Sequence, residues 1–223
     1  MMIKHVCKTN KLQMCFVIIF LLMSPNSYAE PVWHLYKNKN GVRVFYQNSS
    51  DNTFKVKAQM SVNSISTYDF LALLSDTKTA PKWLENVSQV KTIKYISPSE
   101  NLVYSYINSP WPVRDRDSIT HTCYSQLTAN KSQLLINARP NELPKNDGVI
   151  RITTLNARWL LTESKDQLTI EYQVYALPGG AIPTWLSNKV GLKSTYNTFV
   201  SLHYLLTHKK YTPTPPIIKT GKC

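Results

Sequence analysis

The chain has 223 residues, 43% of them hydrophobic, which suits one domain with a sizeable core. Its 26 Lys and Arg exceed its 13 Asp and Glu, so the formal charge is +13 and an anionic partner is favoured, either a membrane surface or a nucleic acid. The basic residues are scattered, with no run longer than Lys209-Lys210, and no nucleic-acid module signature occurs. We therefore expect no nucleic-acid ligand.

The first 29 residues have the three parts of a secretory signal peptide. Lys4, Lys8 and Lys11 form a positive segment, residues 14–23 (MCFVIIFLLM) form an apolar core, and a small-x-small cleavage site follows at residues 27–29. An uncleaved membrane anchor is the alternative, but the apolar run is too short to span a bilayer. We expect removal of residues 1–29 and export of the mature chain to the periplasm or the surrounding medium.

Cysteine is sparse in the expected mature chain. Cys7 and Cys15 lie in the signal segment, which leaves Cys123 in a predicted strand and Cys223 at the end of the sequence. An exported protein can form a disulfide, but the sequence leaves open whether these two side chains can meet. Two cysteines do not make a metal site, and the histidines have no ligand-like spacing to them. We expect no metal and no cofactor.

Alternation of apolar and polar residues predicts the first part of the fold. Three strands come first, at 32–37, 42–47 and 53–60, and the first two flank an Asn40-Gly41 turn. A helix capped by Ser or Thr is expected at 64–75. Six further strands follow, at 89–96, 101–108, 118–127, 132–138, 148–161 and 167–177. Short polar turns join them into three successive hairpins, which predicts a meandering antiparallel sheet.

The last predicted element is a helix over residues 182–206. Its apolar residues recur at helical spacing and form one face, made of Trp185, Leu192, Tyr196, Phe199, His203 and Leu206. Residues 207–223 contain three prolines and no periodicity, so we expect an extended, basic tail.

These elements predict an α+β fold, a curved antiparallel sheet wrapped around the C-terminal helix. One helix cannot fill the volume that such a sheet encloses, so an internal cavity is expected. Its walls should be apolar, because the strands at 148–161 and 167–177 place apolar residues on alternate positions.

Two motifs in this order resemble the START domains, the StAR-related lipid-transfer family. The first is Pro110-Trp111-Pro112 followed by Arg116-Asp117 and a strand, and the second runs from Pro178-Gly179-Gly180 to Asn188. The likeness extends over residues 32–206. It implies a helix-grip domain over residues 30–206 that holds one lipid in an internal tunnel. The 108–116 loop, the 139–148 loop and the C-terminal helix would form its gate.

The resemblance also suggests which residues contact the lipid or form the gate. They are Trp111, Pro112, Arg116, Trp159, Tyr172, Trp185, Leu192, Tyr196 and Phe199. Trp111 would cap the tunnel or enter a membrane interface, where an aromatic ring with a polar edge is well suited. The alternative is that Trp111 fills a gap in the core.

The pattern departs from the family in one place. Several members carry a second arginine on the strand after Arg-Asp, facing an acid on the neighbouring strand. Here the corresponding residue is Thr122, with an apolar residue near Val103 opposite. The resemblance therefore does not imply a charged pair that binds a lipid headgroup in this chain. We expect Arg116 and Asp117 to form a structural ion pair that locks the loop to the sheet.

Two classes of function remain. The first is a non-enzymatic, monomeric carrier that binds one phospholipid or sterol-like lipid and contacts anionic membranes transiently. The second is a helix-grip enzyme, a cyclase or hydrolase, with its active site in the same cavity. The second needs an acid, base or nucleophile inside, and the available groups are Asp115, Asp117, His121, Glu163 and Glu171. No catalytic sequence motif occurs, so we expect a carrier.

Overall fold

The computed structural model describes residues 32–47, 54–208 and 223 of the chain. Within these ranges it contains ten strands, two α-helices and one short 3-10 helix. In chain order the elements are β1 (His34–Lys39), β2 (Val42–Gln47), β3 (Phe54–Asn63), α2 (Thr67–Ser75), η1 (Ala80–Lys82), β4 (Val87–Ser97), β5 (Glu100–Ile107), β6 (Arg116–Thr128), β7 (Lys131–Ala138), β8 (Ile150–Arg151), β9 (Thr154–Ser164), β10 (Gln167–Leu177) and α3 (Thr184–His208).

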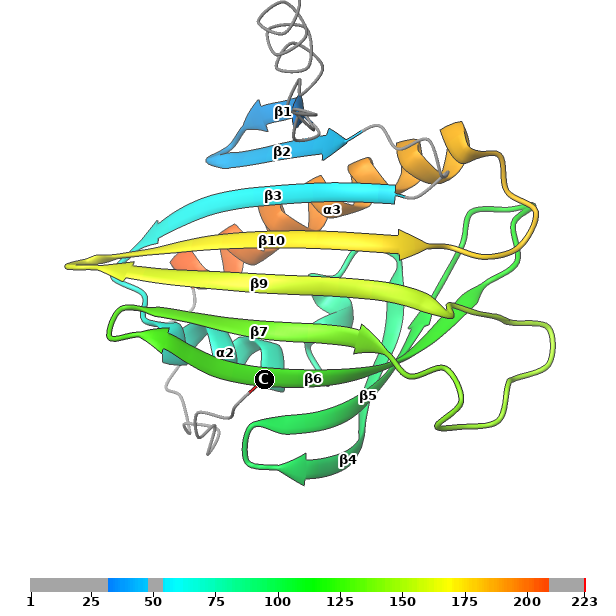
Figure 1. Cartoon of the computed structure of the whole chain (residues 1–223). Helices are drawn as coiled ribbons and strands as arrows, with labels where there is room; N and C mark the ends of the chain where they lie inside the picture. The colour runs from blue at the N-terminus through cyan, green and yellow to red at the C-terminus, as the bar shows by residue number, and fades with distance from the viewer. Residues whose placement is uncertain (1–31, 48–53, 209–222) are drawn as a thin grey trace, which may run out of the picture. The chain divides into compact units, whose positions relative to one another are not determined.

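The strands form one sheet in the order β1-β2-β3-β10-β9-β7-β6-β5-β4. Figure 1 shows these strands side by side, with α2 and α3 together behind the sheet. Apart from β8, each neighbouring pair of strands from β4 to β10 is antiparallel, which confirms the predicted meander. Asn40 and Gly41 both have positive φ, 56° and 73°, as the hairpin turn between β1 and β2 requires.

The prediction of one strand over residues 148–161 is wrong. The two residues of β8 leave that line and pair in parallel with Arg116 and Asp117 at the start of β6, so β9 begins only at Thr154. A buried ion pair between Arg151 and Asp117 fixes this position, and it outweighs the local alternation of apolar residues. The last helix is also shifted, since α3 begins at Thr184 and continues to His208.

Helix α3 packs against β2 and β3 on the inner face of the sheet. The residues that it buries confirm the predicted apolar face in its main part, and they are Leu192, Tyr196, Phe199, Leu202 and Leu206. The Asn40 side-chain amide donates to the Tyr196 hydroxyl at 3.2 Å, and Lys37 lies 3.9 Å from the centre of the Tyr196 ring. The first hairpin is thereby attached to the helix.

Four aromatic rings join both helices to the middle of the sheet. Trp159 of β9 stacks on Phe199 of α3 with ring centroids 5.6 Å apart. Phe70 of α2 and Tyr172 of β10 flank Trp159 at 5.2 Å and 4.5 Å. We call Phe70, Trp159, Tyr172 and Phe199 the aromatic cluster. Helix α2, which begins after the capping residue Ser66, is thus held against the same core as α3.

The ends of the chain are described only in part. The predicted signal peptide and residues 209–222 of the predicted tail lie outside the described residues. Cys223 is described, and it is bonded to Cys123 of β6, so the pairing that the sequence left open is formed, with Cα atoms 6.0 Å apart. Among the described residues, none of the helices is long and apolar enough to cross a membrane.

Candidate functional site

A cavity of about 320 Å³ lies between the 108–115 loop, the inner face of β10 and the first half of α3. We call it the gate cavity. Most of its wall is apolar, because each contributing element turns an aliphatic side chain inward. These include Ile107, Ile152, Val174, Ala176, Ile182 and Leu186. Such a space suits an apolar ligand with few polar groups.

The 108–115 loop is closed on itself by Asp115. One Asp115 carboxylate oxygen accepts a hydrogen bond from the Ser109 backbone N–H at 2.8 Å, and the other accepts from the Tyr106 hydroxyl at 2.9 Å. These bonds favour the charged carboxylate and lower the pKa of Asp115. Pro110 and Pro112 restrict the backbone between the two ends, and the Trp111–Pro112 peptide bond is cis. The bonds to Asp115 and the fixed φ of the two prolines thus both restrain this loop.

Trp111 stands at the tip of this loop and is 94% exposed. Filling a gap in the core is therefore the wrong interpretation of Trp111, and its ring does not cap the cavity either. Pro112 is exposed beside Trp111, and Trp185 in the first turn of α3 is 67% exposed. Two large aromatic side chains thus face solvent on the two elements that border the gate cavity.

Arg116 and Asp117 do not form the expected ion pair. Successive residues of a strand point to opposite faces of the sheet. The side chains of Arg116 and Asp117, at the start of β6, therefore cannot meet. Arg116 points inward and borders the gate cavity, while Asp117 points outward toward Arg151 of β8. Each of the two charged residues therefore holds a different loop.

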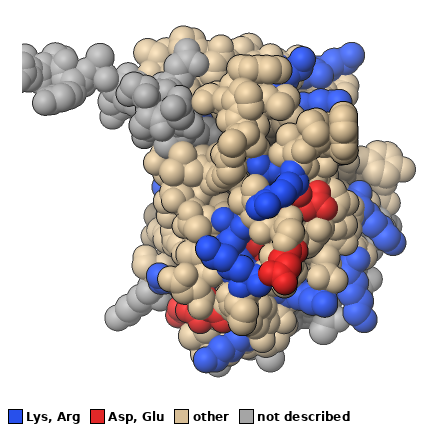
Figure 2. Space-filling view, turned by 90° about the vertical axis from the view of Figure 1, so that its right-hand side faces the viewer, with Lys and Arg blue, Asp and Glu red and all other residues tan. Residues whose placement is uncertain are grey.

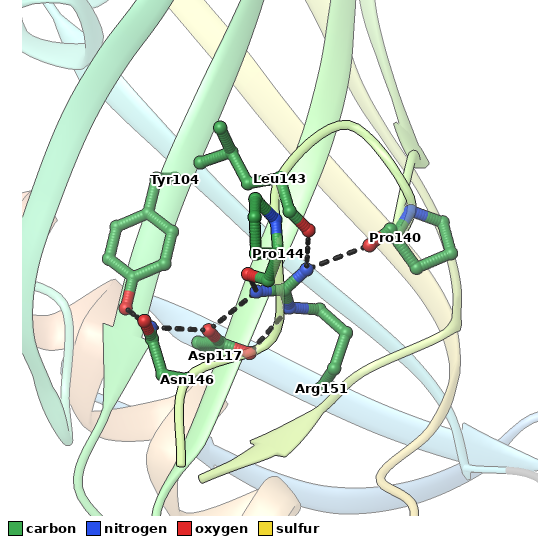
Figure 3. Close-up of polar contacts among 7 residues, drawn as sticks. All are labelled: Tyr104, Asp117, Pro140, Leu143, Pro144, Asn146 and Arg151. Atoms are coloured by element: carbon green, nitrogen blue, oxygen red, sulfur yellow. Dashed lines mark hydrogen bonds and ion pairs between the residues drawn. The ribbon is translucent and has the colours of Figure 1, made fainter.

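Asp117 and Arg151 fasten the loop between β7 and β8. Arg151 Nε and Nη2 donate to the two Asp117 carboxylate oxygens at 2.6 Å and 2.9 Å, and both side chains are 1% exposed. The remaining guanidinium N–H groups donate to the carbonyls of Pro140, Leu143 and Pro144. Figure 3 shows the guanidinium between Asp117 and these carbonyls. The hydrogen bonds to Asp117 raise the pKa of Arg151.

Arg116 joins two segments of the chain in a different way. Its Nη1 donates to the Ser109 hydroxyl at 3.1 Å and to the Arg114 carbonyl, both in the 108–115 loop. Its Nε and Nη2 donate to the carbonyls of Pro178 and Gly179, at 3.4 Å and 3.2 Å, just before α3. Arg116 is 5% exposed, and burial lowers its pKa. One guanidinium thus joins both sides of the cavity mouth.

Tyr172 connects the gate cavity to the aromatic cluster. It borders the cavity from β10, and its ring contacts Trp159 and Phe199. Burial raises the pKa of its phenol, so this group stays protonated. Tyr172 is thus the member of the aromatic cluster that borders the cavity. Four of the expected contact residues lie in the core around it, and they are Trp159, Leu192, Tyr196 and Phe199.

A second cavity, of about 540 Å³, lies between α2 and strands β4 to β6. It shares no lining residue with the gate cavity. Its wall is richer in hydroxyl and amide groups, among them Thr92, Asn101 and Thr122. The Thr122 hydroxyl donates to the Asn101 side chain at 2.6 Å, so Asn101 and not Val103 faces Thr122. In this region, where the resemblance implied a tunnel, the described residues line these two cavities.

None of the five acid or base candidates borders the gate cavity. His121 bonds Glu100 of the adjacent strand at 2.8 Å, a partner that the sequence did not indicate. Glu163 accepts from the Thr67 backbone N–H at 2.6 Å, and Glu171 accepts from Gln59 and Gln173. Among the described residues, no group of three or more His, Cys, Asp or Glu could hold a metal ion.

The comparisons with known proteins agree with this architecture. A family model described as the START domain matches residues 21–209. The chain belongs to the START domain family. Among START-related structures, the STAR-related lipid transfer protein from Xanthomonas axonopodis has a TM-score of 0.72 with 26% identity, over 78% of this chain and 98% of that one. Human STARD10 has a TM-score of 0.66 with 21% identity, over 79% and 76%. The predicted helix-grip fold is therefore confirmed.

Two relatives in sequence cover most of this chain. An uncharacterized protein of Pseudomonas aeruginosa is 29% identical over 178 residues, which cover 79% of this chain and 87% of that protein. Mouse START domain-containing protein 10 is 24% identical over 164 residues, which cover 72% of this chain and 56% of the mouse protein. The chain thus spans only about half the length of the mouse relative.

Proposed function

We propose that this START domain binds one lipid in the gate cavity and carries or presents it between membranes without catalysing a reaction. The supporting observation is an apolar cavity closed by two elements that one buried arginine joins. The two gate elements must separate for a lipid to enter. Gly179 and Gly180, both at positive φ before α3, are suited to take up such a movement.

Membrane contact is the second part of the proposal. Trp111 and Trp185 are exposed on the two gate elements, and an aromatic ring with a polar edge is favoured at a bilayer interface. The full chain has a formal charge of +13, and removal of residues 1–29 with their three lysines leaves +10. Attraction to an anionic surface is worth roughly 1 kcal/mol per basic side chain close to it. We expect transient docking of the gate end on anionic membranes by a monomer.

Export is the third part, and it rests on the sequence of residues 1–29 alone. A periplasmic or secreted carrier would shuttle lipid outside the inner membrane. N-terminal sequencing of the protein from its own host should find Glu30 as the first residue. Recovery of an intact chain in the cytoplasm would contradict export without affecting the lipid-binding part.

Blocking the cavity tests lipid binding directly. Ala176 borders the gate cavity from β10, so Ala176→Phe should fill part of it and reduce lipid uptake at least severalfold. Gln173→Phe on the same strand is a matched control, because residue 173 points to the opposite face. Native mass spectrometry after incubation with lipid extract, and uptake of a fluorescent fatty acyl probe, measure binding. Equal uptake by both variants and the unmodified protein would contradict binding in this cavity.

A further inference from the structure

Arg116 is a buried cation without a carboxylate partner. It is 5% exposed, and none of the acidic groups among the described residues lies within ion-pair distance of it. Asp115 acts on it only at longer range, because both Asp115 oxygens are turned to Ser109 and Tyr106. Burying a charge is costly unless it is paired. The neutral oxygens around Arg116 compensate that cost only in part.

Arg151 shows what a purely structural arginine looks like in the same protein. All five of its N–H groups have acceptors, and two of the bonds go to Asp117. Arg116 has five N–H groups as well, but only four bonds, all of them to carbonyl or hydroxyl oxygens. One N–H on Nη2 therefore lacks an acceptor among the described residues. Its position beside an apolar cavity makes it available to a ligand.

Exposed basic side chains also lie near the cavity, together with two acidic ones, Glu85 in the cavity wall and Asp115 in the 108–115 loop. Arg114 in the 108–115 loop and Lys189 in the first half of α3 are exposed. Figure 2, which faces the end of the molecule where α3 begins, shows Lys and Arg side chains gathered with fewer Asp and Glu between them. An anion approaching this end meets a favourable potential before it reaches Arg116.

We propose that the gate cavity takes a single-chain anionic amphiphile, whose carboxylate or phosphate binds the Arg116 guanidinium while its alkyl chain lies along β10. This inference rests on the proposed lipid binding and names the class of ligand. The planar guanidinium can donate to two oxygens of either acid group, the carboxylate or the phosphate. The acid would take the free N–H of Nη2 and compete with the Pro178 and Gly179 carbonyls. Binding would then loosen the contact that joins the gate elements.

The size of the cavity favours one chain over two. Its volume of about 320 Å³ is near the lower end of ligand sites, which span roughly 300–1,000 Å³. The wall residues Ala176, Val174 and Tyr172 follow one another along the inner face of β10. At about 3.3 Å per residue, Ala176 and Tyr172 are ~13 Å apart, which provides one straight apolar path inward from the mouth.

Matched ligands separate the acid group from the chain. The full-length protein, freed of endogenous lipid, is titrated with oleate and with oleyl alcohol, which share one alkyl chain, and binding is measured by displacement of a fluorescent fatty acyl probe. Oleate should bind roughly tenfold to hundredfold more tightly than oleyl alcohol. This ratio corresponds to the free energy of one charge-assisted hydrogen bond. Oleoyl lysophosphatidate serves as a third ligand, and its affinity relative to oleate shows whether phosphate or carboxylate is preferred.

Variants of Arg116 and of Arg114, two residues apart, test whether Arg116 causes the preference for oleate. Arg116→Gln should remove the preference for oleate while oleyl alcohol still binds, and Arg116→Lys should retain part of it. Arg114→Gln removes the same charge from an exposed residue, whose attraction for the anion is screened by solvent, and should keep most of the preference. A residue that only holds the gate shut would change both ligands equally when substituted. The decisive readout is therefore the difference in affinity between oleate and oleyl alcohol.

The outcomes distinguish this inference from the proposed function. Equal affinity of the unmodified protein for oleate and oleyl alcohol would overturn the anionic ligand and leave lipid binding intact. A preference that survives in Arg116→Gln would overturn the role of Arg116. Failure of every single-chain ligand to bind would overturn the single-chain class, and failure of two-chain phospholipids and sterols as well would overturn the proposed function itself.

Discussion

Substitution of Asp117 by Asn should be among the most damaging single changes on the surface-facing side of the sheet. Asp117 and Arg151 are each 1% exposed, and two short bonds of 2.6 Å and 2.9 Å join them. Asp117→Asn leaves the Arg151 charge buried with one amide oxygen in place of a carboxylate. Breaking a buried pair in this way typically costs about 3–5 kcal/mol. That is a large part of the roughly 5–15 kcal/mol that stabilises an ordinary domain.

Urea unfolding followed by tryptophan fluorescence measures this loss. Asp115→Asn is the matched control, because it makes the same chemical change two residues earlier at a carboxylate that has no ion pair. Its loss should be clearly smaller. Hydrogen exchange should also rise in residues 139–148 of Asp117→Asn, since Arg151 orients the carbonyls of that loop. A loss below about 1 kcal/mol for Asp117→Asn would refute the reasoning.

Two further substitutions separate surface function from stability. Trp111→Ala should change the free energy of unfolding by less than about 0.5 kcal/mol, since the ring is exposed, yet reduce sedimentation with anionic vesicles at low salt. Undiminished sedimentation would contradict its membrane role. Cys123→Ser and Cys223→Ser should each lower the free energy of unfolding by about 2–4 kcal/mol, because the bridge joins residues 100 positions apart. The losses are measured by urea unfolding without a reducing agent. Unequal losses would show that one of the two cysteine side chains stabilises the fold by contacts other than the disulfide.

Most of the fold could be predicted from local patterns. Alternation along the strands and helical spacing in α3 depend on which face of an element is buried, and each is visible within about ten residues. The two residues of β8 have no such pattern. They are held by the Arg151–Asp117 pair, whose partners are 34 positions apart, so nothing local distinguishes this arginine from a solvated one. The continuous strand over 148–161 was wrong for that reason.

The gate was predicted less well, although one signal was present. Adjacent strand residues face opposite ways, so Arg116 and Asp117 had to have different partners once β6 was placed at its observed start. Apolar residues offered no comparable signal. A tryptophan such as Trp159 has the same inward pattern whether it contacts a ligand or packs on Phe199, because a core and a cavity wall select the same side chains.

If a lipid enters the gate cavity as we propose, the aromatic cluster would limit how deep it can go. Tyr172 belongs both to the cavity wall and to the cluster, and behind it Trp159 and Phe199 are packed ring on ring. An alkyl chain longer than the path to Tyr172 has to fold back or remain partly outside. The protein should therefore discriminate among homologous ligands by chain length, with affinity rising for each added methylene until the cluster is reached and levelling off beyond it.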